Sequence, residues 1–302
     1  MIHKPVVLIT GASGFIGSYL VTYLLNLDYQ IIALTRHRHR QKQQPSLEWI
    51  EDLSEIKTNK IDYVINLAGE SIGQGRWTEK RKDELKQSRI KTTKNLYEYL
   101  KRNNIFPKTI ISGSAVGFYG IDQMEKWSDV CSENASPQSI FMSELCQQWE
   151  AVTAQYPEQK TKTIRLGVVF GRKGGILPQM LLPIRLNLIG KMGSGKQPCV
   201  WIHIQDVLRS IVFLMTTETS QSIFNVVAPE KVCQANFVST SANILKRKPF
   251  ITLPSFIMKL MLGEQSQLIL NGQYVKPKAL QDAGFEFKYP TLKQALKDLL
   301  EN

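Results

Sequence analysis

The stretch Val6-Val7-Leu8-Ile9-Thr10-Gly11-Ala12-Ser13-Gly14-Phe15-Ile16-Gly17 decides the fold of this chain. A short apolar run enters a glycine-rich turn, and the turn opens a helix with apolar residues at helical spacing. Gly11 permits a tight turn, Gly14 lets the backbone approach a pyrophosphate, and Gly17 lets the helix pack closely on the strand. The N–H groups at the start of the helix attract phosphates. The stretch therefore predicts a dinucleotide-binding turn, with a purely structural strand-to-helix turn as the alternative.

Outward from this turn, strands and helices alternate as they do in parallel α/β sheets. We expect further strands at 30–35, 47–50, 61–66, 109–112, 163–169, 200–202 and 223–226, and helices at 14–27, 80–104, 139–155, 176–188 and 205–215. Beyond Gly171 glycines and prolines interrupt the pattern, and residues 190–195 read as a loop. The pattern predicts a doubly wound, Rossmann-like parallel sheet with a smaller C-terminal α/β lid domain. The expected domains are residues 1–172, to which part of 200–230 returns, and residues 173–302.

The composition is that of a globular protein of enzyme size. The chain has 302 residues, 43% of them hydrophobic and 21% charged, which is enough to bury a large core. It holds no apolar run long enough to span a bilayer and starts directly on a strand, so we expect a cytoplasmic protein without a membrane partner. The four cysteines are scattered, so we expect reduced thiols and no metal site. A monomer or a homodimer fits these features.

The net charge of +12 raises the question of nucleic-acid binding. The densest basic cluster is Arg36-His37-Arg38-His39-Arg40-Gln41-Lys42, and no basic stripe is interleaved with aromatic residues. We therefore expect a generally basic surface and no specific nucleic-acid partner. Arg36 stands where NAD-binding sites carry an acidic residue for the ribose 2′-OH, and its planar guanidinium suits a 2′-phosphate. The sequence therefore favours NADP(H) over NAD(H), unless Arg36 is simply a solvated side chain.

Further motifs follow one another along the chain, namely Asn66-Leu67-Ala68-Gly69, Ser112–Gly120, Arg165–Gly171 and Trp201–Asp206. Together with the glycine turn they resemble the extended short-chain dehydrogenase/reductase superfamily and its NAD-dependent epimerase/dehydratase-like members. The residues that narrow the resemblance are Asn66–Ile72, Arg76–Thr78, Gln87–Arg89 and Gly193–Ile204. They are similar to the branch labelled "epimerase family protein", also labelled a cell-division inhibitor. Residues of about 248–297 resemble the C-terminal domain of unknown function of that branch.

The resemblance implies an oxidoreductase or nucleoside-diphosphate-sugar-epimerase-like enzyme that acts on an unidentified small molecule. The resemblance implies that Ser13 to Ile16 cradle the pyrophosphate and that Leu67 to Gly69 line the adenosine and ribose. It also implies that Leu166 and Gly167 lie beside the nicotinamide. With the glycine turn and the arginine, the expected cofactor-binding residues are Gly11, Ser13, Gly14, Phe15, Ile16, Arg36, Leu67, Ala68, Gly69, Leu166 and Gly167. Residues 198–200 lack the arginine that grips the diphosphate in sugar-nucleotide enzymes, which argues against a sugar nucleotide as substrate.

The catalytic centre departs from the superfamily pattern. The general acid/base of the superfamily is a tyrosine in a Y-x-x-x-K pair, and Ile140 and Glu144 occupy those two positions here. Isoleucine cannot transfer a proton, and a carboxylate raises the pKa of a nearby phenol instead of lowering it. Other Y-x-x-x-K matches lie in the wrong place along the chain or contain a proline, among them Tyr97/Lys101, Tyr156/Lys160 and Tyr274/Lys278.

Two hydroxyl residues remain as catalytic candidates, and Glu144 could act as a base if burial raised its pKa. Ser114 matches the catalytic serine of the superfamily, and Tyr119 follows it closely in the chain. We hypothesise that both hydroxyls donate hydrogen bonds to a substrate oxygen. The alternative is a catalytically silent NADP-binding protein whose cofactor state signals to a partner.

Overall fold

The computed structural model describes residues 4–42, 44–122 and 124–301. Its largest unit is a seven-stranded sheet in the order β11-β7-β5-β4-β1-β2-β3, in which every neighbouring pair is parallel. The strands are β1 (Val6–Thr10), β2 (Gln30–Leu34), β3 (Leu47–Ile50), β4 (Tyr63–Asn66), β5 (Thr109–Ala115), β7 (Thr161–Leu166) and β11 (Ile223–Val226). The strand order reverses beside β1, and ligands of such sheets bind in the crevice at that carboxyl edge.

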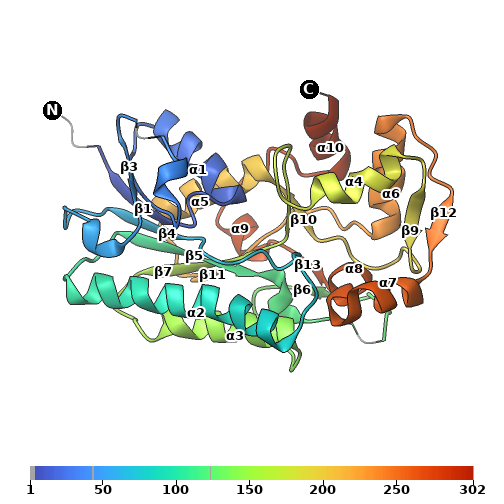
Figure 1. Cartoon of the computed structure of the whole chain (residues 1–302), viewed down its shortest axis with the longest axis horizontal. Coiled ribbons are helices and arrows are strands. Elements are labelled where there is room, and N and C mark those ends of the chain that lie inside the picture. Colours follow the sequence, from blue (N-terminus) through green and yellow to red (C-terminus); the bar gives the residue numbers. More distant parts are fainter. Residues whose placement is uncertain (1–3, 43, 123, 302) are drawn as a thin grey trace.

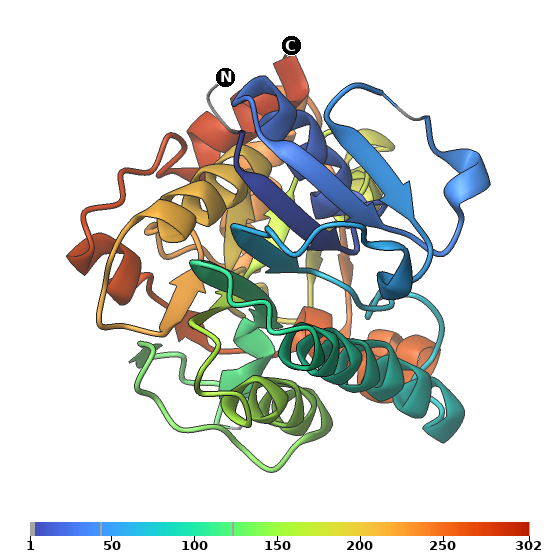
Figure 2. The same ribbon diagram turned by 90° about the vertical axis from the view of Figure 1, so that its left-hand side faces the viewer.

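Helices cover both faces of the sheet, as Figures 1 and 2 show. The first face carries α1 (Phe15–Asn26) and α5 (Ile204–Thr216), and the second carries α2 (Glu79–Arg102) and α3 (Phe141–Ala154). Successive strand residues point to opposite faces, so Ile9 joins the core beneath α1 and α5, and Leu8 joins the core beneath α2. The structure thus confirms the doubly wound parallel sheet predicted from the sequence.

A smaller lobe follows at the other end of the molecule (Figure 1). Its own core includes Phe170, Trp201, Phe237 and Leu296. The lobe and the segments that join it to the sheet consist of β8 (Val168–Phe170), α4 (Leu177–Arg185), β9 (Ile189–Met192), β10 (Trp201–His203), α6 (Gln234–Leu245), β12 (Ile251–Leu253), α7 (Ser255–Leu262), α8 (Gln267–Leu270), α9 (Lys278–Asp282) and α10 (Leu292–Glu301). A short parallel pair, β6 (Val130–Cys131) with β13 (Tyr274–Val275), ties the C-terminal segment to the loop after β5.

The structure corrects two predicted elements. The single strand expected at 163–169 is two strands, because β7 joins the large sheet whereas β8 pairs with β10. Gly167 separates them, and a Cβ at this position would lie 2.9 Å from the carbonyl oxygen of Val200. The loop expected at 190–195 begins as strand β9, which pairs with β12 more than fifty residues away. Only a distant partner makes this glycine-containing segment a strand, so its local pattern does not predict one.

Within residues 200–230, β11 pairs with β7 in the large sheet and α5 packs on that sheet, while the domain boundaries themselves stay a prediction. Throughout the described ranges, every helix is too short or too polar to cross a lipid bilayer.

Candidate cofactor-binding site

The glycine turn is built by close backbone approaches that exclude any side chain. Gly11 has a φ of +72°, and a Cβ there would lie 2.6 Å from the carbonyl oxygen of Leu67. A Cβ on Gly17 would lie 2.2 Å from the carbonyl oxygen of Gly11. The N–H of Gly14 donates to the Gly11 carbonyl at 3.0 Å and closes the turn. Glycine is therefore required at Gly11 and Gly17 for steric reasons that exist before any ligand binds.

The start of α1 offers an open site for an anion. Gly14 is the N-cap residue and supplies no side-chain hydrogen bond, and the first turn of the helix contains no acidic residue. Ser13 and Gly14 are exposed, and the Ser13 hydroxyl accepts a hydrogen bond from the Thr35 hydroxyl at 3.1 Å. The unpaired N–H groups and the positive end of the helix dipole suit a phosphate group. The described residues of this turn thus fit the pyrophosphate of a dinucleotide.

Phe15 and Ile16 contribute their backbone to this turn, while their side chains pack elsewhere. The Phe15 ring touches the loop after β8, since Cβ atoms on Gly174 or Gly175 would lie 2.8 and 2.7 Å from it. Both side chains pack against the core beneath α1 and α5. The backbone N–H of Lys173 donates to the Tyr19 hydroxyl at 3.1 Å, which also holds this loop against α1. The loop after β8 is therefore fixed beside the candidate phosphate site.

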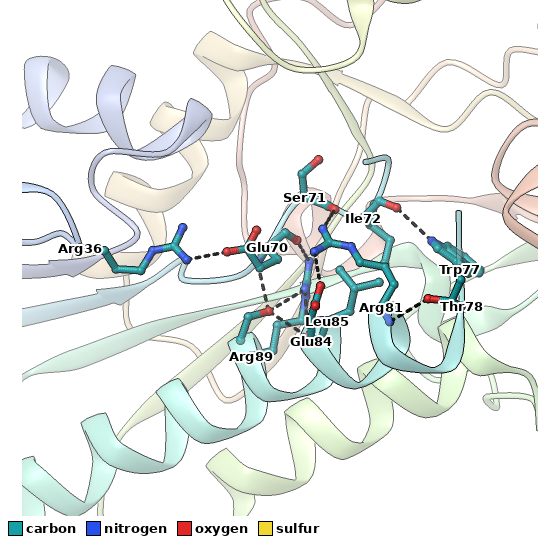
Figure 3. A network of polar contacts seen from close by, with 11 residues as sticks. Arg36, Glu70, Ser71, Ile72, Trp77, Thr78, Arg81, Glu84, Leu85 and Arg89 are labelled. Carbon is teal, nitrogen blue, oxygen red and sulfur yellow. Dashed lines mark hydrogen bonds and ion pairs between the residues drawn. The ribbon is translucent and has the colours of Figure 1, made fainter. Parts of the chain in front are cut away.

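Arg36 lies at the expected adenosine end, directly after β2. Its side chain is 80% exposed, and its Nη1 donates to Oε1 of Glu70 at 2.6 Å (Figure 3). Glu70 follows Gly69 in the loop after β4, and its backbone N–H donates to the Ser88 hydroxyl at 3.0 Å. No sequence pattern assigned a role to Glu70. Its place within the Asn66–Ile72 motif was the available signal.

Basic side chains of α2 hold the loop after β4 by its carbonyl groups (Figure 3). Arg89 donates to the carbonyls of Glu70 at 2.8 Å and Leu85 at 3.1 Å, and its guanidinium lies over the Trp149 ring, 5.4 Å from the ring centroid. Arg81 donates to the Ser71 carbonyl at 2.8 Å. Burial lowers the pKa of the Arg89 guanidinium, which forms no ion pair with any described residue.

The remaining predicted cofactor residues lie at the ends of β4 and β7. Leu67 and Leu166 are half-buried and pack against the core beneath α1 and α5. Ala68 is half-buried, and a Cβ on Gly69 would lie 3.1 Å from Cζ of Arg89. Gly167 donates its N–H to the Val226 carbonyl at 3.2 Å. These residues share the carboxyl edge of the sheet with the glycine turn.

The structure brings Ser114 and Tyr119 together, but through a buried arginine. The Ser114 hydroxyl donates to Oε1 of Glu150 at 2.6 Å, and Arg165 donates to both oxygens of Glu150 at 2.9 and 2.7 Å. The Tyr119 hydroxyl accepts from Nη1 of Arg165 at 2.9 Å and donates to Oδ1 of Asn225 at 2.6 Å. Both hydroxyl residues are buried, and burial raises the pKa of Tyr119. Their donor hydrogens are therefore already engaged by protein acceptors.

The positions of the missing dyad lie at the start of α3. Ile140 is the half-buried N-cap residue, and Glu144 is exposed in the first turn. The α3 side chains nearest Gly117, just after β5, are instead Met142 and Cys146. Burial raises the pKa of the Cys146 thiol to about 11, so it stays protonated at neutral pH. Neither of these two side chains therefore exchanges a proton readily at neutral pH, and Glu150, further along α3, is engaged by Ser114 and Arg165.

Comparison with known proteins shows which family this chain resembles. Residues 7–227 match the model of the NAD dependent epimerase/dehydratase family, and residues 253–299 match a domain of unknown function. An epimerase family protein of Staphylococcus aureus (strain MRSA252) is 37% identical over 298 residues, covering 97% of this chain and 98% of the relative. A relative of the same description from Staphylococcus saprophyticus is also 37% identical over 298 residues, with the same coverage.

Two solved structures share the fold along nearly the whole chain. The human epimerase family protein SDR39U1, crystallised with NADPH, is 32% identical with a TM-score of 0.88, covering 98% of this chain and 99% of that one. A nucleoside-diphosphate sugar epimerase from Corynebacterium glutamicum is 26% identical with a TM-score of 0.75, covering 99% of this chain and 58% of that one. These matches confirm the resemblance drawn from the sequence motifs. The chain belongs to the NAD dependent epimerase/dehydratase family.

Proposed function

We propose that this protein binds NADP(H) at the carboxyl edge of its large sheet and acts as an oxidoreductase or epimerase-like enzyme on a small molecule. The observation that carries the proposal is the open start of α1, which has no capping side chain and no acidic residue. Exposed Arg36 at the end of β2 adds a cation suited to a 2′-phosphate. The NADPH held by the human family protein supports the same cofactor.

The proposal assigns a part of the cofactor to each group of residues. Gly11, Ser13 and Gly14, with the backbone of Phe15 and Ile16, would hold the pyrophosphate. Arg36 would hold the 2′-phosphate after leaving Glu70, and Leu67 to Gly69 would line the adenosine and its ribose. Leu166 and Gly167 would lie beside the nicotinamide. When bound, the cofactor supplies or accepts a hydride, and these residues bind and orient it.

A second candidate function rests on the buried setting of Ser114 and Tyr119. Both hydroxyl groups donate to protein acceptors, and Ile140 and Glu144 replace the usual dyad. A silent NADP-binding protein needs no proton donor at the nicotinamide, so this arrangement favours a cofactor sensor. An active enzyme would require substrate to displace Glu150 or Asn225 as hydrogen-bond acceptor.

The cofactor proposal is tested by titrating the protein with NADPH and NADH and following nicotinamide fluorescence. Arg36→Ala should weaken NADPH binding about 10- to 100-fold, since charge-assisted hydrogen bonds contribute about 1.5–3 kcal/mol. It should leave NADH binding unchanged, which makes NADH the internal control for folding. Equal loss for both nucleotides, or no loss for either, would contradict the assignment of Arg36.

The choice between enzyme and sensor needs a separate measurement. Stereospecific transfer of the NADPH hydride to members of a carbonyl-compound library, followed by deuterium labelling, would support the enzyme. NADPH binding without transfer to any compound, together with NADPH-dependent protection from proteolysis, would support the sensor.

A further inference from the structure

The end of the molecule remote from the large sheet carries a run of exposed apolar side chains. Figure 1 places β12 and α7 at this end. Phe250 is 78% exposed, Phe256 67% and Leu260 77%. Large apolar side chains gathered on one surface mark an interaction site, whereas single exposed ones are ordinary.

Backbone contacts extend this surface to the end of α4. The N–H of Ile251 donates to the Leu188 carbonyl at 2.9 Å, and the N–H of Lys248 donates to Oδ1 of Asn187 at 2.7 Å. Leu186 and Leu188, which flank Asn187, are exposed as well. We call this surface the distal face, and its apolar members are Leu186, Leu188, Phe250, Ile251, Phe256, Leu260 and Met261.

The chain segments that form the distal face carry charges of one sign. Residues 159–205 and 231–263, which contribute all of its members, contain no aspartate or glutamate, although the chain has 26 acidic residues. Exposed basic side chains in β9, in α7 and in the loop between α6 and β12 are Lys191, Lys246, Arg247, Lys248 and Lys259. Among the described residues none of these five has an ion-pair partner. The surface thus combines apolar side chains with uncompensated positive charge.

We propose that the distal face docks on the surface of an anionic lipid bilayer. The phenylalanine and leucine side chains would enter the boundary between headgroups and acyl chains, and the basic side chains would meet lipid phosphates. A second copy of the chain fits this face less well, because a two-fold contact would bring the same positive charges together. The expectation of no membrane partner rested on the lack of a spanning segment, which has no bearing on surface contact.

The position of α7 links this surface to the candidate site. Arg76, in the loop after β4, donates to the Leu260 carbonyl at 3.4 Å, and Lys82 pairs with Glu264 just beyond α7 at 2.7 Å. Glu70, which pairs with Arg36 beside the candidate cofactor site, belongs to the same loop. A bilayer bound at the distal face would therefore lie beside the segment that borders the candidate cofactor site.

The test is co-sedimentation of the full chain with large vesicles. Vesicles of equimolar phosphatidylglycerol and phosphatidylcholine should carry the protein down, and vesicles of phosphatidylcholine alone should not. About 0.5 M NaCl should weaken the binding, because it shortens the screening length. The triple variant Lys246→Gln, Arg247→Gln, Lys248→Gln should bind on the order of 100-fold more weakly, and Phe250→Ser with Phe256→Ser should also reduce binding.

A matched control removes three positive charges elsewhere, with Lys42→Gln, Lys57→Gln and Lys60→Gln. It should bind anionic vesicles within about two-fold of the parent, and NADPH binding by every variant checks its folding. Equal loss in the control triple would mean that net charge alone attracts the protein, which overturns the proposal. A concentration-dependent dimer that Phe250→Ser dissociates, without vesicle binding, would also overturn it and assign the face to a second copy.

Discussion

Arg36 and Glu70 lie 34 residues apart in the chain and form an ion pair of 2.6 Å where β2 and the loop after β4 meet. The pair places a carboxylate against the group proposed to receive a 2′-phosphate. A phosphate and Glu70 would compete for the same guanidinium, since both bind it through oxygen acceptors. Glu70 is therefore expected to tune the choice between NADPH and NADH.

Replacement of Glu70 tests this relationship. Glu70→Gln removes the competing charge and keeps the shape of the side chain, so NADPH should bind about 2- to 5-fold more tightly, as expected for an exposed pair of up to about 1 kcal/mol. NADH affinity should change less. Calorimetric titration with both nucleotides measures the ratio, and Glu84→Gln, in the neighbouring pair with Arg81, is the matched control. A weaker NADPH complex in Glu70→Gln would show that Glu70 assists the cofactor.

The close approach at Gly11 predicts a costly substitution. Gly11→Ala combines an unfavourable φ with a Cβ that would lie 2.6 Å from the Leu67 carbonyl, so it should destabilise the protein by about 2–5 kcal/mol. Gly75→Ala is the control, because Gly75 has a φ of +73° and open space around it. It should cost only about 1–2 kcal/mol. Urea unfolding of both variants compares them, and equal costs would show that contact with the loop after β4 is unimportant.

The network around Arg165 predicts unequal costs for its members. Arg165→Met leaves the carboxylate of Glu150 without its bidentate partner, so the free energy of unfolding should fall by about 3–5 kcal/mol. Ser114→Ala removes one hydrogen bond to the same carboxylate and should cost about 1–3 kcal/mol.

Urea unfolding measures both variants, and nucleotide titration shows whether the network also supports the site. Under the sensor interpretation, Ser114→Ala keeps the NADPH affinity of the parent. A loss of hydride transfer in Ser114→Ala at unchanged stability would instead favour the catalytic role inferred from the resemblance.

His203 predicts a dependence of stability on pH. The residue is buried at the start of α5, where its Nδ1 accepts a hydrogen bond from the Gln205 N–H at 3.0 Å. Burial lowers the pKa of His203, and this effect outweighs the negative charges of Asp298 and Asp206, which raise it. The unfolded chain has a histidine pKa of about 6.5 and so binds more protons than the folded chain below neutral pH. Stability should therefore be full above about pH 7 and fall as the pH drops through 6.5 toward the lower folded pKa.

Urea midpoints measured between about pH 5 and 8 check this slope. His203→Gln should flatten it while lowering the overall stability, because the amide cannot titrate. His39→Gln changes an exposed histidine and should keep the slope of the parent. An unchanged slope in His203→Gln would assign the effect to another group.

The sequence was sufficient for the local parts of the site. The apolar run of β1, the glycines of the turn and the alternation of strands and helices are consecutive features, and each indicates its structure without a distant partner. Ile140 and Glu144, in place of the usual dyad, are likewise visible in the sequence alone. The basic residue after β2 could be found in the same way.

Contacts between distant segments decided the rest. Only folding brings Glu70 to Arg36, joins Ser114 and Tyr119 through Arg165, and makes a strand of residues 189–192. The physical reason is that periodicity and turn chemistry report the conformation of neighbouring residues, whereas a side chain's charge partner or a strand's pairing depends on how whole elements pack. The sequence by itself therefore determined the sheet and its glycine turn, and the tertiary structure decided which polar groups of the candidate site remain free to act.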